Sequence, residues 1–327
     1  MLNGKTILIT GGTGSFGQKC TEMILNAFQP EKLIIFSRDE LKQFEMSNRF
    51  SVNDYNCLRY FIGDVRDRER LYRAFAGVDY IIHAAALKQV PAAERNPFEV
   101  IKTNIIGAQN IVDAAIDCGV KKVIALSTDK AANPVNLYGA TKLCSDKLFI
   151  AGNSYSGQWE TKFSVVRYGN VIGSRGSVVP LLKKMRSKGI VPVTHPEMTR
   201  FWITLEQGVN FVLRCLAMAE GGELFVPKIP SMKLADLVEA VAPGCRHDIV
   251  GIRPGEKIHE VMITEDDARH TLEFDDYFII EPEFNWWSNK NHLSRGGKPL
   301  TEGFVYASNT NNRWLTPSEL KDYVGGS

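Results

Sequence analysis

The sequence of 327 residues predicts an α/β fold, a doubly wound parallel sheet followed by a smaller α+β region. Three observations predict it. Short apolar stretches alternate with amphipathic ones through the first half, as expected for parallel strands joined by helices. The first apolar stretch runs directly into a turn with three glycines. After residue 170 the alternation ends in segments rich in Gly, Pro and polar residues, which indicate the smaller region.

The elements of the sheet follow from local patterns. Apolar, β-branched runs predict strands at 5–10, 32–37, 58–63, 79–84, 122–128 and 163–168. Apolar residues at helical spacing predict helices at 15–27, 39–50, 68–75, 104–118 and 137–151, with later helices at 205–219 and 233–241.

Domain organisation follows from the same change of pattern. We expect the sheet domain at 1–170, with a later return of the chain around 200–225, and the smaller region at 171–282. A C-terminal extension is expected at 283–327, because its stretch 283–313 has no periodicity and suits a surface segment.

Composition excludes several classes of function. The net charge is only +2, so no nucleic-acid surface is indicated. No apolar run approaches the roughly 18 residues of a membrane-spanning helix, so no membrane partner is expected. The six cysteines and six histidines lack metal-ligand spacing. We therefore expect no metal site, and reduced thiols in a cytoplasmic protein.

The glycine-rich turn predicts a Rossmann-type dinucleotide site. Glycines at the spacing G-x-x-G-x-x-G let the backbone approach a pyrophosphate, which the following helix N-terminus would bind. The alternative is a tight structural turn. The residues expected to contact the dinucleotide here are Gly11, Thr13, Gly14, Ser15, Phe16 and Gly17.

The end of the second strand bears on the choice between NAD and NADP. Ser37, Arg38 and Lys42 offer a hydroxyl and two cations, which suit a 2′-phosphate. Asp39 and Glu40 argue for NAD, although both also fit the first turn of a helix. We expect NADP, and the contacts are assigned to Ser37, Arg38, Asp39, Glu40, Leu41 and Lys42.

Two further strand ends complete the expected cofactor site. Asp64 could accept a hydrogen bond from the adenine amino group, with Val65 against the ring. The small residue Ala84 leaves room for the cofactor, and Lys88 is expected to touch a sugar hydroxyl or a phosphate. His83 is expected to be a structural histidine.

The segment "LSTDK", followed by Tyr138 and Lys142, indicates redox chemistry. Leu126 and Ser127 end the fifth strand at the edge where ligands bind, so both are expected near the cofactor. Tyr138 and Lys142 are four residues apart and share one helix face. A lysine there should lower the pKa of the tyrosine, whose phenolate could take a proton from an alcohol as hydride leaves.

These motifs resemble the extended short-chain dehydrogenase/reductases over nearly the whole chain. Within them, "FSRDELK", "HAAALKQVP", "LSTDKAANPVNLYGATK", "VVRYGNVIGSRGSVVP", "MTRFWIT" and "GIRPGEKIHEVMI" are similar to the inverting UDP-N-acetylglucosamine 4,6-dehydratases. Retaining relatives usually carry Thr-Asp-Glu where this sequence has Thr128, Asp129 and Lys130. The resemblance implies the product UDP-2-acetamido-2,6-dideoxy-β-L-arabino-hexos-4-ulose, the first intermediate toward pseudaminic acid.

The resemblance also implies roles for the "TDK" residues. Lys130 as a neutral amine would take the C5 proton, and Asp129 as a neutral acid would protonate the departing C6 hydroxyl. We expect a depressed pKa for Lys130, from burial, from Lys142 and from the positive cofactor ring. Asp129 needs a raised pKa, so the two would titrate as a coupled pair. The alternative is a plain salt bridge at a strand end.

Nucleotide-sugar contacts are expected mainly from the second half. Arg200 and Arg253 could bind the diphosphate, and Glu256 a ribose hydroxyl. Val171 is expected near the nicotinamide carboxamide. The substrate residues are Lys88, Asn170, Arg175, Ser177, Val179, Thr194, Arg200, Arg253 and Glu256.

Two other functions and the oligomeric state stay open at this point. A retaining dehydratase or a 4-epimerase could use the same fold, and a non-enzymatic NADP-sensing protein is a further alternative. The resemblance implies UDP-N-acetylglucosamine as the partner and a homo-oligomer, a dimer or a hexamer.

Overall fold

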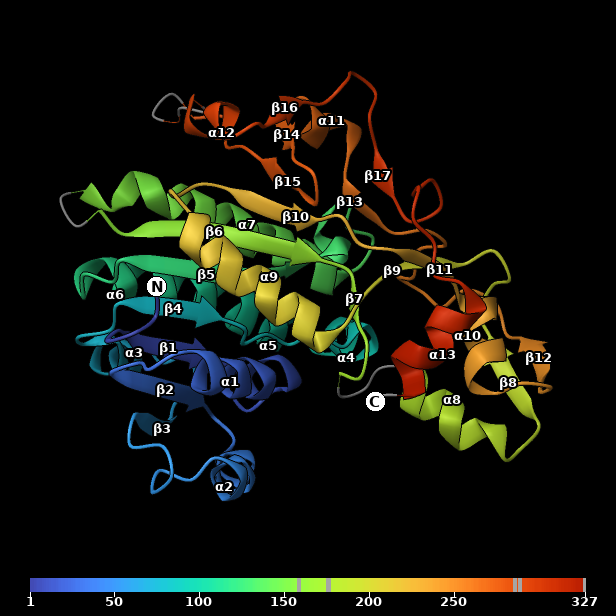
Figure 1. The fold of residues 1–327 in the computed structure, drawn as a ribbon, viewed down its shortest axis with the longest axis horizontal. Helices are drawn as coiled ribbons and strands as arrows, with labels where there is room; N and C mark the ends of the chain where they lie inside the picture. Colours follow the sequence, from blue (N-terminus) through green and yellow to red (C-terminus); the bar gives the residue numbers. More distant parts are fainter. Residues whose placement is uncertain (158–159, 175–177, 285–286, 288–289, 326–327) are drawn as a thin grey trace.

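A computed structural model describes residues 1–327 apart from 158–159, 175–177, 285–286, 288–289 and 326–327. Its main feature is a sheet of the order β16-β14-β15-β10-β6-β5-β4-β1-β2-β3 (Figure 1). The strands from β3 to β10 are parallel, and β15, β14 and β16 continue the sheet antiparallel. Their bounds are β1 (Thr6–Thr10), β2 (Lys32–Ser37), β3 (Leu58–Ile62), β4 (Tyr80–His83), β5 (Lys122–Thr128), β6 (Lys162–Tyr168), β10 (Leu224–Pro227), β14 (Thr271–Glu273), β15 (Tyr277–Ile280) and β16 (Lys298–Pro299).

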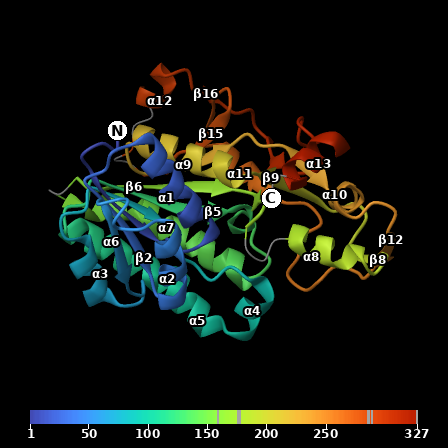
Figure 2. The ribbon, with the colours of Figure 1, turned by 60° about the horizontal axis from the view of Figure 1, so that its bottom comes forward.

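Helices cover both faces of this sheet, which confirms the doubly wound fold. Figure 1 shows α1 and α9 in front of the strands and α3, α6 and α7 behind them, and Figure 2 shows α9 and α7 on opposite sides of β5 and β6. The helices of this part are α1 (Ser15–Ala27), α2 (Glu40–Arg49), α3 (Arg68–Phe75), α6 (Gly107–Asp117), α7 (Leu137–Tyr155) and α9 (Leu205–Met218). The expected return of the chain around 200–225 is therefore made by α9, which packs on α1, and by β10.

One stretch departs from the expected elements. The helix predicted at 104–118 is formed mainly by α6, and its first residues belong to a π-helical turn (η1, Lys102–Ile106). Two short helices that the periodicity does not predict, α4 (Val90–Arg95) and α5 (Pro97–Ile101), precede this turn. Asn104 lies in that turn and bonds both backbone groups of Leu87 and the hydroxyl of Thr141. A π turn preserves the apolar helical pattern while it reorients one side chain, so periodicity alone does not reveal it.

The smaller region has its own apolar core. It contains one sheet of β7 (Asn170–Val171), β9 (Thr199–Ile203) and β11 (Ser231–Lys233), and a pair of β8 (Ile190–Val193) with β12 (Arg246–Ile249). Three helices pack here, α8 (Val178–Arg186), α10 (Leu234–Val241) and α13 (Pro317–Gly325) (Figure 1, right). Trp202, Leu237 and Leu320 are among the residues buried in this second core.

The expected C-terminal extension, 283–327, is built into both parts instead of standing apart. β16 ends the main sheet, β17 (Tyr306–Ala307) pairs with β13 (Val261–Ile263), and α13 packs on α10. The remaining short elements are η2 (Asp129–Ala131), α11 (Glu265–Ala268) and α12 (Lys290–Ser294). Strand pairing between distant segments needs no helical or alternating pattern, so β16 and β17 can form within a stretch that looks aperiodic in the sequence. Across the described ranges, no helix combines the length and apolarity needed to cross a membrane.

Candidate functional site

The glycine-rich turn after β1 forms a cradle that side chains would fill. Gly11 has φ +64°, and a Cβ there would lie 2.8 Å from Ala85 N. A Cβ on Gly17 would lie 2.3 Å from Gly12 O, because the start of α1 packs directly on the turn. This close approach of bare backbone at a helix N-terminus fits a pyrophosphate, as the sequence predicts.

Two adjoining cavities open where the parallel strands end. The larger, of about 890 Å³, runs from the glycine-rich turn to the smaller region, and the second, of about 180 Å³, adjoins it around Lys130, Asn170 and Glu256. A volume of that order is sufficient for a large ligand. Predicted site residues that line the larger cavity are Gly11, Thr13, Gly14, Ser15, Phe16, Gly17, Ser37, Arg38, Asp39, Lys42, Asp64, Val65, Ala84, Lys88, Leu126, Ser127, Thr128, Lys130, Tyr138, Lys142, Asn170, Val171, Val179 and Glu256.

A few predicted residues stand elsewhere. Arg200 and Arg253 line only the smaller cavity. Glu40, Leu41, Asp129 and Thr194 line neither cavity, and Leu41 points into solvent. The hydroxyl of Thr194 lies 3.2 Å from Met198 Sδ in the interior of the smaller region. Arg175 and Ser177 lie outside the described residues.

The end of β2 presents paired charges. Ser37 Oγ lies 2.8 Å from Thr13 Oγ1, which ties it to the glycine-rich turn. Asp39 caps α2 by accepting from Lys42 N, and its carboxylate also forms an ion pair with Lys42 Nζ. Arg38 Nη1 lies 3.6 Å from Asp64 Oδ2. Arg38 and Lys42 both line the larger cavity, and each is paired with a carboxylate, Asp64 and Asp39 respectively.

Asp64 lines the larger cavity, whereas His83 is buried in the core and lines neither cavity. Burial alone would raise the pKa of Asp64, but hydrogen bonds from Arg66 hold it below its usual value. His83 is buried with Nδ1 2.8 Å from Thr10 Oγ1, and burial lowers its pKa to about 3. A neutral, bonded ring confirms the structural role expected for His83.

Tyr138 and Lys142 lie on α7 beside the end of β5, but the expected pKa effect is wrong. Burial raises the pKa of Tyr138 to about 12, and the cation that opposes this most is Lys130 instead of Lys142. Burial also lowers the pKa of Lys142, whose counter-charge is Asp146 one turn further along the helix. Desolvation of the phenolate thus outweighs the helix neighbour that the sequence offers.

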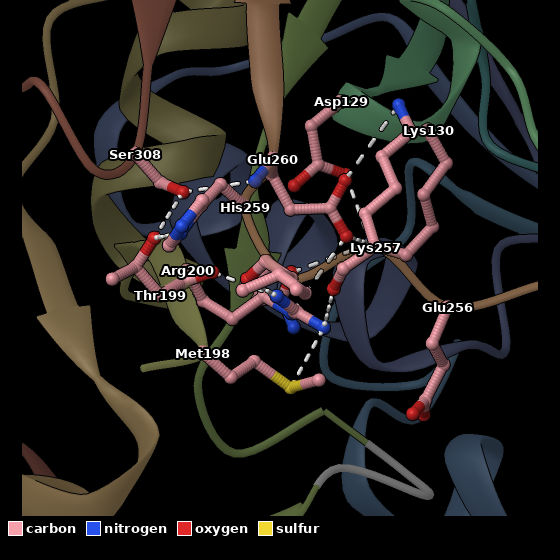
Figure 3. Close-up of polar contacts among 12 residues, drawn as sticks. Asp129, Lys130, Met198, Thr199, Arg200, Glu256, Lys257, His259, Glu260 and Ser308 are labelled. Carbon is pink, nitrogen blue, oxygen red and sulfur yellow. Dashed lines mark hydrogen bonds and ion pairs between the residues drawn. The ribbon is translucent and has the colours of Figure 1, made fainter. Parts of the chain in front are cut away.

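Lys130 stands in the centre of a charged cluster (Figure 3). Its Nζ lies 3.0 Å from Asp129 Oδ1, 3.2 Å from Glu260 Oε1 and 3.5 Å from Asn170 Oδ1. The expected depression of its pKa is wrong. Burial favours the neutral amine, yet the carboxylates of Asp129 and Glu260 outweigh it and raise the pKa above its ordinary value.

Glu260 is the charged partner that sequence reasoning missed. It lies just before β13, and its side chain is only 2% exposed. The string "GIRPGEKIHE" contains it, but nothing local in the sequence indicates that Glu260 reaches the end of β5. Lys257 was missed as well; its Nζ donates a 2.6 Å hydrogen bond to Ala132 O.

Arg200 has partners other than the diphosphate expected for it. It is buried, and its two terminal nitrogens donate to the carbonyls of Thr199, Lys257 and Ile258 and to Met198 Sδ (Figure 3). Four donors are thereby used within the protein. Arg253, by contrast, is 57% exposed at the smaller cavity, with Nη1 3.7 Å from Glu256 Oε1.

No group of three or more His, Cys, Asp or Glu side chains suited to a metal ion occurs in the described part of the chain. The charged groups at the end of β5 are instead pairs of carboxylates and amines. Such pairs can exchange protons directly, which is acid–base chemistry.

Comparison with known proteins agrees with this arrangement. The polysaccharide biosynthesis protein family matches residues 7–282. A UDP-N-acetylglucosamine 4,6-dehydratase (inverting) from Campylobacter jejuni strain 81-176 is 56% identical and covers 99% of this chain and 98% of its own.

Two solved structures share the fold. The X-ray structure of Pen from Bacillus thuringiensis is 36% identical with a TM-score of 0.89, covering 100% of this chain and 98% of its own. DesIV, a dTDP-glucose 4,6-dehydratase from Streptomyces venezuelae with NAD and TYD bound, is 22% identical with a TM-score of 0.69, covering 77% and 86%. The chain thus belongs to the polysaccharide biosynthesis protein family and has the fold of the extended short-chain dehydrogenase/reductases.

Proposed function

We propose that the protein is an NADP-dependent UDP-N-acetylglucosamine 4,6-dehydratase that inverts C5. The observation that carries the proposal is the pair Asp129 and Lys130, 3.0 Å apart at the end of β5. Asp129 is buried behind Lys130, which lines the same cavity as Tyr138 and the glycine cradle. The 56% identical relative named as an inverting enzyme supports the same reaction.

The residues present fit a nicotinamide dinucleotide, and the charges at β2 favour NADP. Arg38 and Lys42 are the cations at the cavity rim, where a 2′-phosphate would meet them. Asp39, the acid that would favour NAD, is engaged in capping α2. When bound, the oxidised nicotinamide would accept hydride from C4, and the reduced nicotinamide would return it to C6. The oxidised ring would also add a positive charge to the site.

Tyr138 serves the redox half of the reaction. As phenolate it takes the proton of the C4 hydroxyl, which requires its pKa to fall from about 12. The nearby cation Lys130 already lowers that pKa in part. Lys142, buried on the next turn, would hold the ribose and add a second cation.

Asp129 and Lys130 serve the elimination half. The proton of the Lys130 ammonium moves across 3.0 Å to Asp129, which leaves an amine and a carboxylic acid side by side. The amine then takes the proton at C5, made acidic by the 4-keto group, and Asp129 gives its proton to the C6 hydroxyl. Water leaves with the electron pair of the C6–O bond, so the protons balance.

Inversion requires that C5 receive a proton on the face opposite to Lys130. The proton that Tyr138 took from the C4 hydroxyl serves this step, which returns Tyr138 to the phenolate and closes the proton balance. The product would be UDP-2-acetamido-2,6-dideoxy-β-L-arabino-hexos-4-ulose, in the first step toward pseudaminic acid. Arg253 is the better placed diphosphate ligand, since it is exposed at the smaller cavity while Arg200 is engaged elsewhere. We also propose a cytoplasmic homo-oligomer.

The test is the product formed from UDP-N-acetylglucosamine and NADP⁺. The proton NMR spectrum should show the methyl group of a 6-deoxy sugar, and the carbon spectrum should show a 4-keto carbon. A 4-epimer without a methyl signal would replace the proposal with an epimerase, and no turnover with bound cofactor would favour a sensing protein. Lys147→Ala, an exposed lysine of α7, is the matched control for Lys130→Ala.

A further inference from the structure

Glu260 is a buried carboxylate surrounded by three cations. Its Oε1 lies 3.2 Å from Lys130 Nζ and 3.7 Å from Arg200 Nε, and its Oε2 lies 4.0 Å from Lys257 Nζ. Within the described residues, Oε2 is fully buried and accepts no hydrogen bond. Burying a carboxylate oxygen without a hydrogen bond has a large desolvation cost, which the charges of nearby cations can offset.

The backbone of Glu260 is held in place independently of its side chain. Its N–H donates to Ser308 Oγ at 2.9 Å, and Ser308 N donates back to its carbonyl at 2.8 Å. Ser308 Oγ lies 2.7 Å from Thr199 Oγ1, which lies 2.8 Å from His259 Nδ1 (Figure 3). The chain thus fixes Glu260 rigidly opposite the end of β5.

This placement of Glu260 completes the set of acceptors around the Lys130 amine. Three oxygens, one each from Asp129, Asn170 and Glu260, lie within 3.5 Å of its Nζ. They are enough acceptors for all three N–H groups of an ammonium. The Lys130 ammonium lies between two carboxylates. It can therefore pass a proton to Asp129 while its contact with Glu260 holds the side chain in that orientation.

We propose that Glu260 is a positioning residue for the elimination step, which holds the Lys130 amine against Asp129 and sets the pH range over which that pair keeps its single proton. The inference rests on the proposed function and deepens it. Glu260 acts through Lys130 and takes no proton from the sugar itself.

The sign of the pH effect follows from the charges that face Lys130. Asp129 and Glu260 face it as anions, Arg200, Lys257 and Lys88 as cations, and Tyr138 as a neutral phenol. A nearby anion favours every protonated form of the Lys130–Asp129 pair. Removing the charge of Glu260 must therefore lower both apparent pKa values of the pair.

The experiment measures C5 proton exchange in D₂O against pH for the holoenzyme with UDP-N-acetylglucosamine. Glu260→Gln keeps the shape and removes the charge, so both limbs of the pH profile should move to lower pH by about one unit or more. Glu260→Asp keeps the charge, so its limbs should stay at the wild-type pH although its rate falls. KM should change less than kcat in both variants, because the proposed role of Glu260 is exerted through Lys130.

A second variant should shift the pH profile in the opposite direction. Lys257→Met removes a cation that faces both Glu260 and Lys130, so the limbs should move to higher pH. If Glu260→Gln fails to fold, this variant still decides the question. Limbs that stay at the wild-type pH in Glu260→Gln, or in Lys257→Met, would overturn the inference. A wild-type enzyme that forms no methyl product would instead overturn the proposed function.

Discussion

The hydroxyl of Ser127 donates a 2.6 Å hydrogen bond to the carboxylate of Asp146, and this bond ties the end of β5 to α7 behind the reacting groups. Asp146 is buried, with Arg167 Nη2 3.7 Å away and Lys142 one turn earlier on the same helix. The two cations therefore share one buried carboxylate. The charge of Lys142 is thus stabilised by a residue that the sequence motif does not include.

Asp146→Asn should destabilise the protein by about 3 kcal/mol, because Lys142 loses its buried counter-charge and Arg167 is left with Asp267, whose Oδ2 lies 3.3 Å from its Nη1. Urea unfolding measures this free energy. The exposed residue Asp54 is a suitable control, and Asp54→Asn should change stability by less than about 0.5 kcal/mol. Equal unfolding free energies for Asp146→Asn and wild type would show that the carboxylate carries no such role.

Gly17→Ala should lower stability by more than about 1 kcal/mol, because its Cβ would overlap Gly12 O, a backbone atom that cannot give way. Binding of NADP⁺ should weaken too, since the displaced turn forms the cradle. Gly208 in α9 is the matched helical glycine, with its nearest neighbour 4.0 Å from the added Cβ. Gly208→Ala should be neutral or stabilising, and a similar result for Gly17→Ala would contradict the close packing described here.

Arg38→Ala should weaken NADP⁺ binding about tenfold while NAD⁺ binding changes little, because only the 2′-phosphate needs the guanidinium. Calorimetric titration with both nucleotides gives the ratio. Arg73→Ala, on the exposed face of α3, is the control. Unchanged discrimination between the two nucleotides would count against Arg38 as the 2′-phosphate ligand.

Glu223 should make stability depend on pH below its unfolded pKa near 4.5. Burial alone would raise its pKa, but hydrogen bonds from His292, Ser164 and two backbone N–H groups lower it in the folded protein. A depressed folded pKa adds stability above the unfolded value, and that stability is lost as pH falls through the folded one. Glu223→Gln should flatten this part of the curve in unfolding experiments between pH 3 and 6, roughly the window in which carboxylates titrate. An equally steep curve in the variant would refute the assignment.

The sequence predicts the strands β1 to β6 closely because they are apolar runs with clear turns, but it does not predict β10, β14, β15 and β16, which complete the same sheet. The strand predicted at 32–37 is β2, and the helix predicted at 68–75 is α3. The pattern cannot place a side chain that arrives from a distant loop. The sequence therefore does not indicate that Glu260 reaches Lys130, nor that its carboxylate helps to raise the pKa of Lys130.

Arg200 shows a second limit. An arginine in a family-like string predicts a phosphate ligand, but a folded chain can use the same donors for its own carbonyls. The motif names the residue type, and only packing decides what its N–H groups meet. Tyr138 is similar, since burial decides its pKa and burial is a property of the fold.

The central claim is that Lys130 handles the proton at C5. The most direct test compares wild type with Lys130→Ala in D₂O, with UDP-N-acetylglucosamine and NADP⁺, reading C5 deuterium by NMR and reduced nicotinamide by absorbance. Lys130→Ala should still reduce the cofactor through Tyr138, but more slowly, because Tyr138 loses the cation that lowers its pKa most, and it should incorporate no deuterium at C5. Deuterium entering C5 at the wild-type rate in Lys130→Ala would show that Lys130 is not the base.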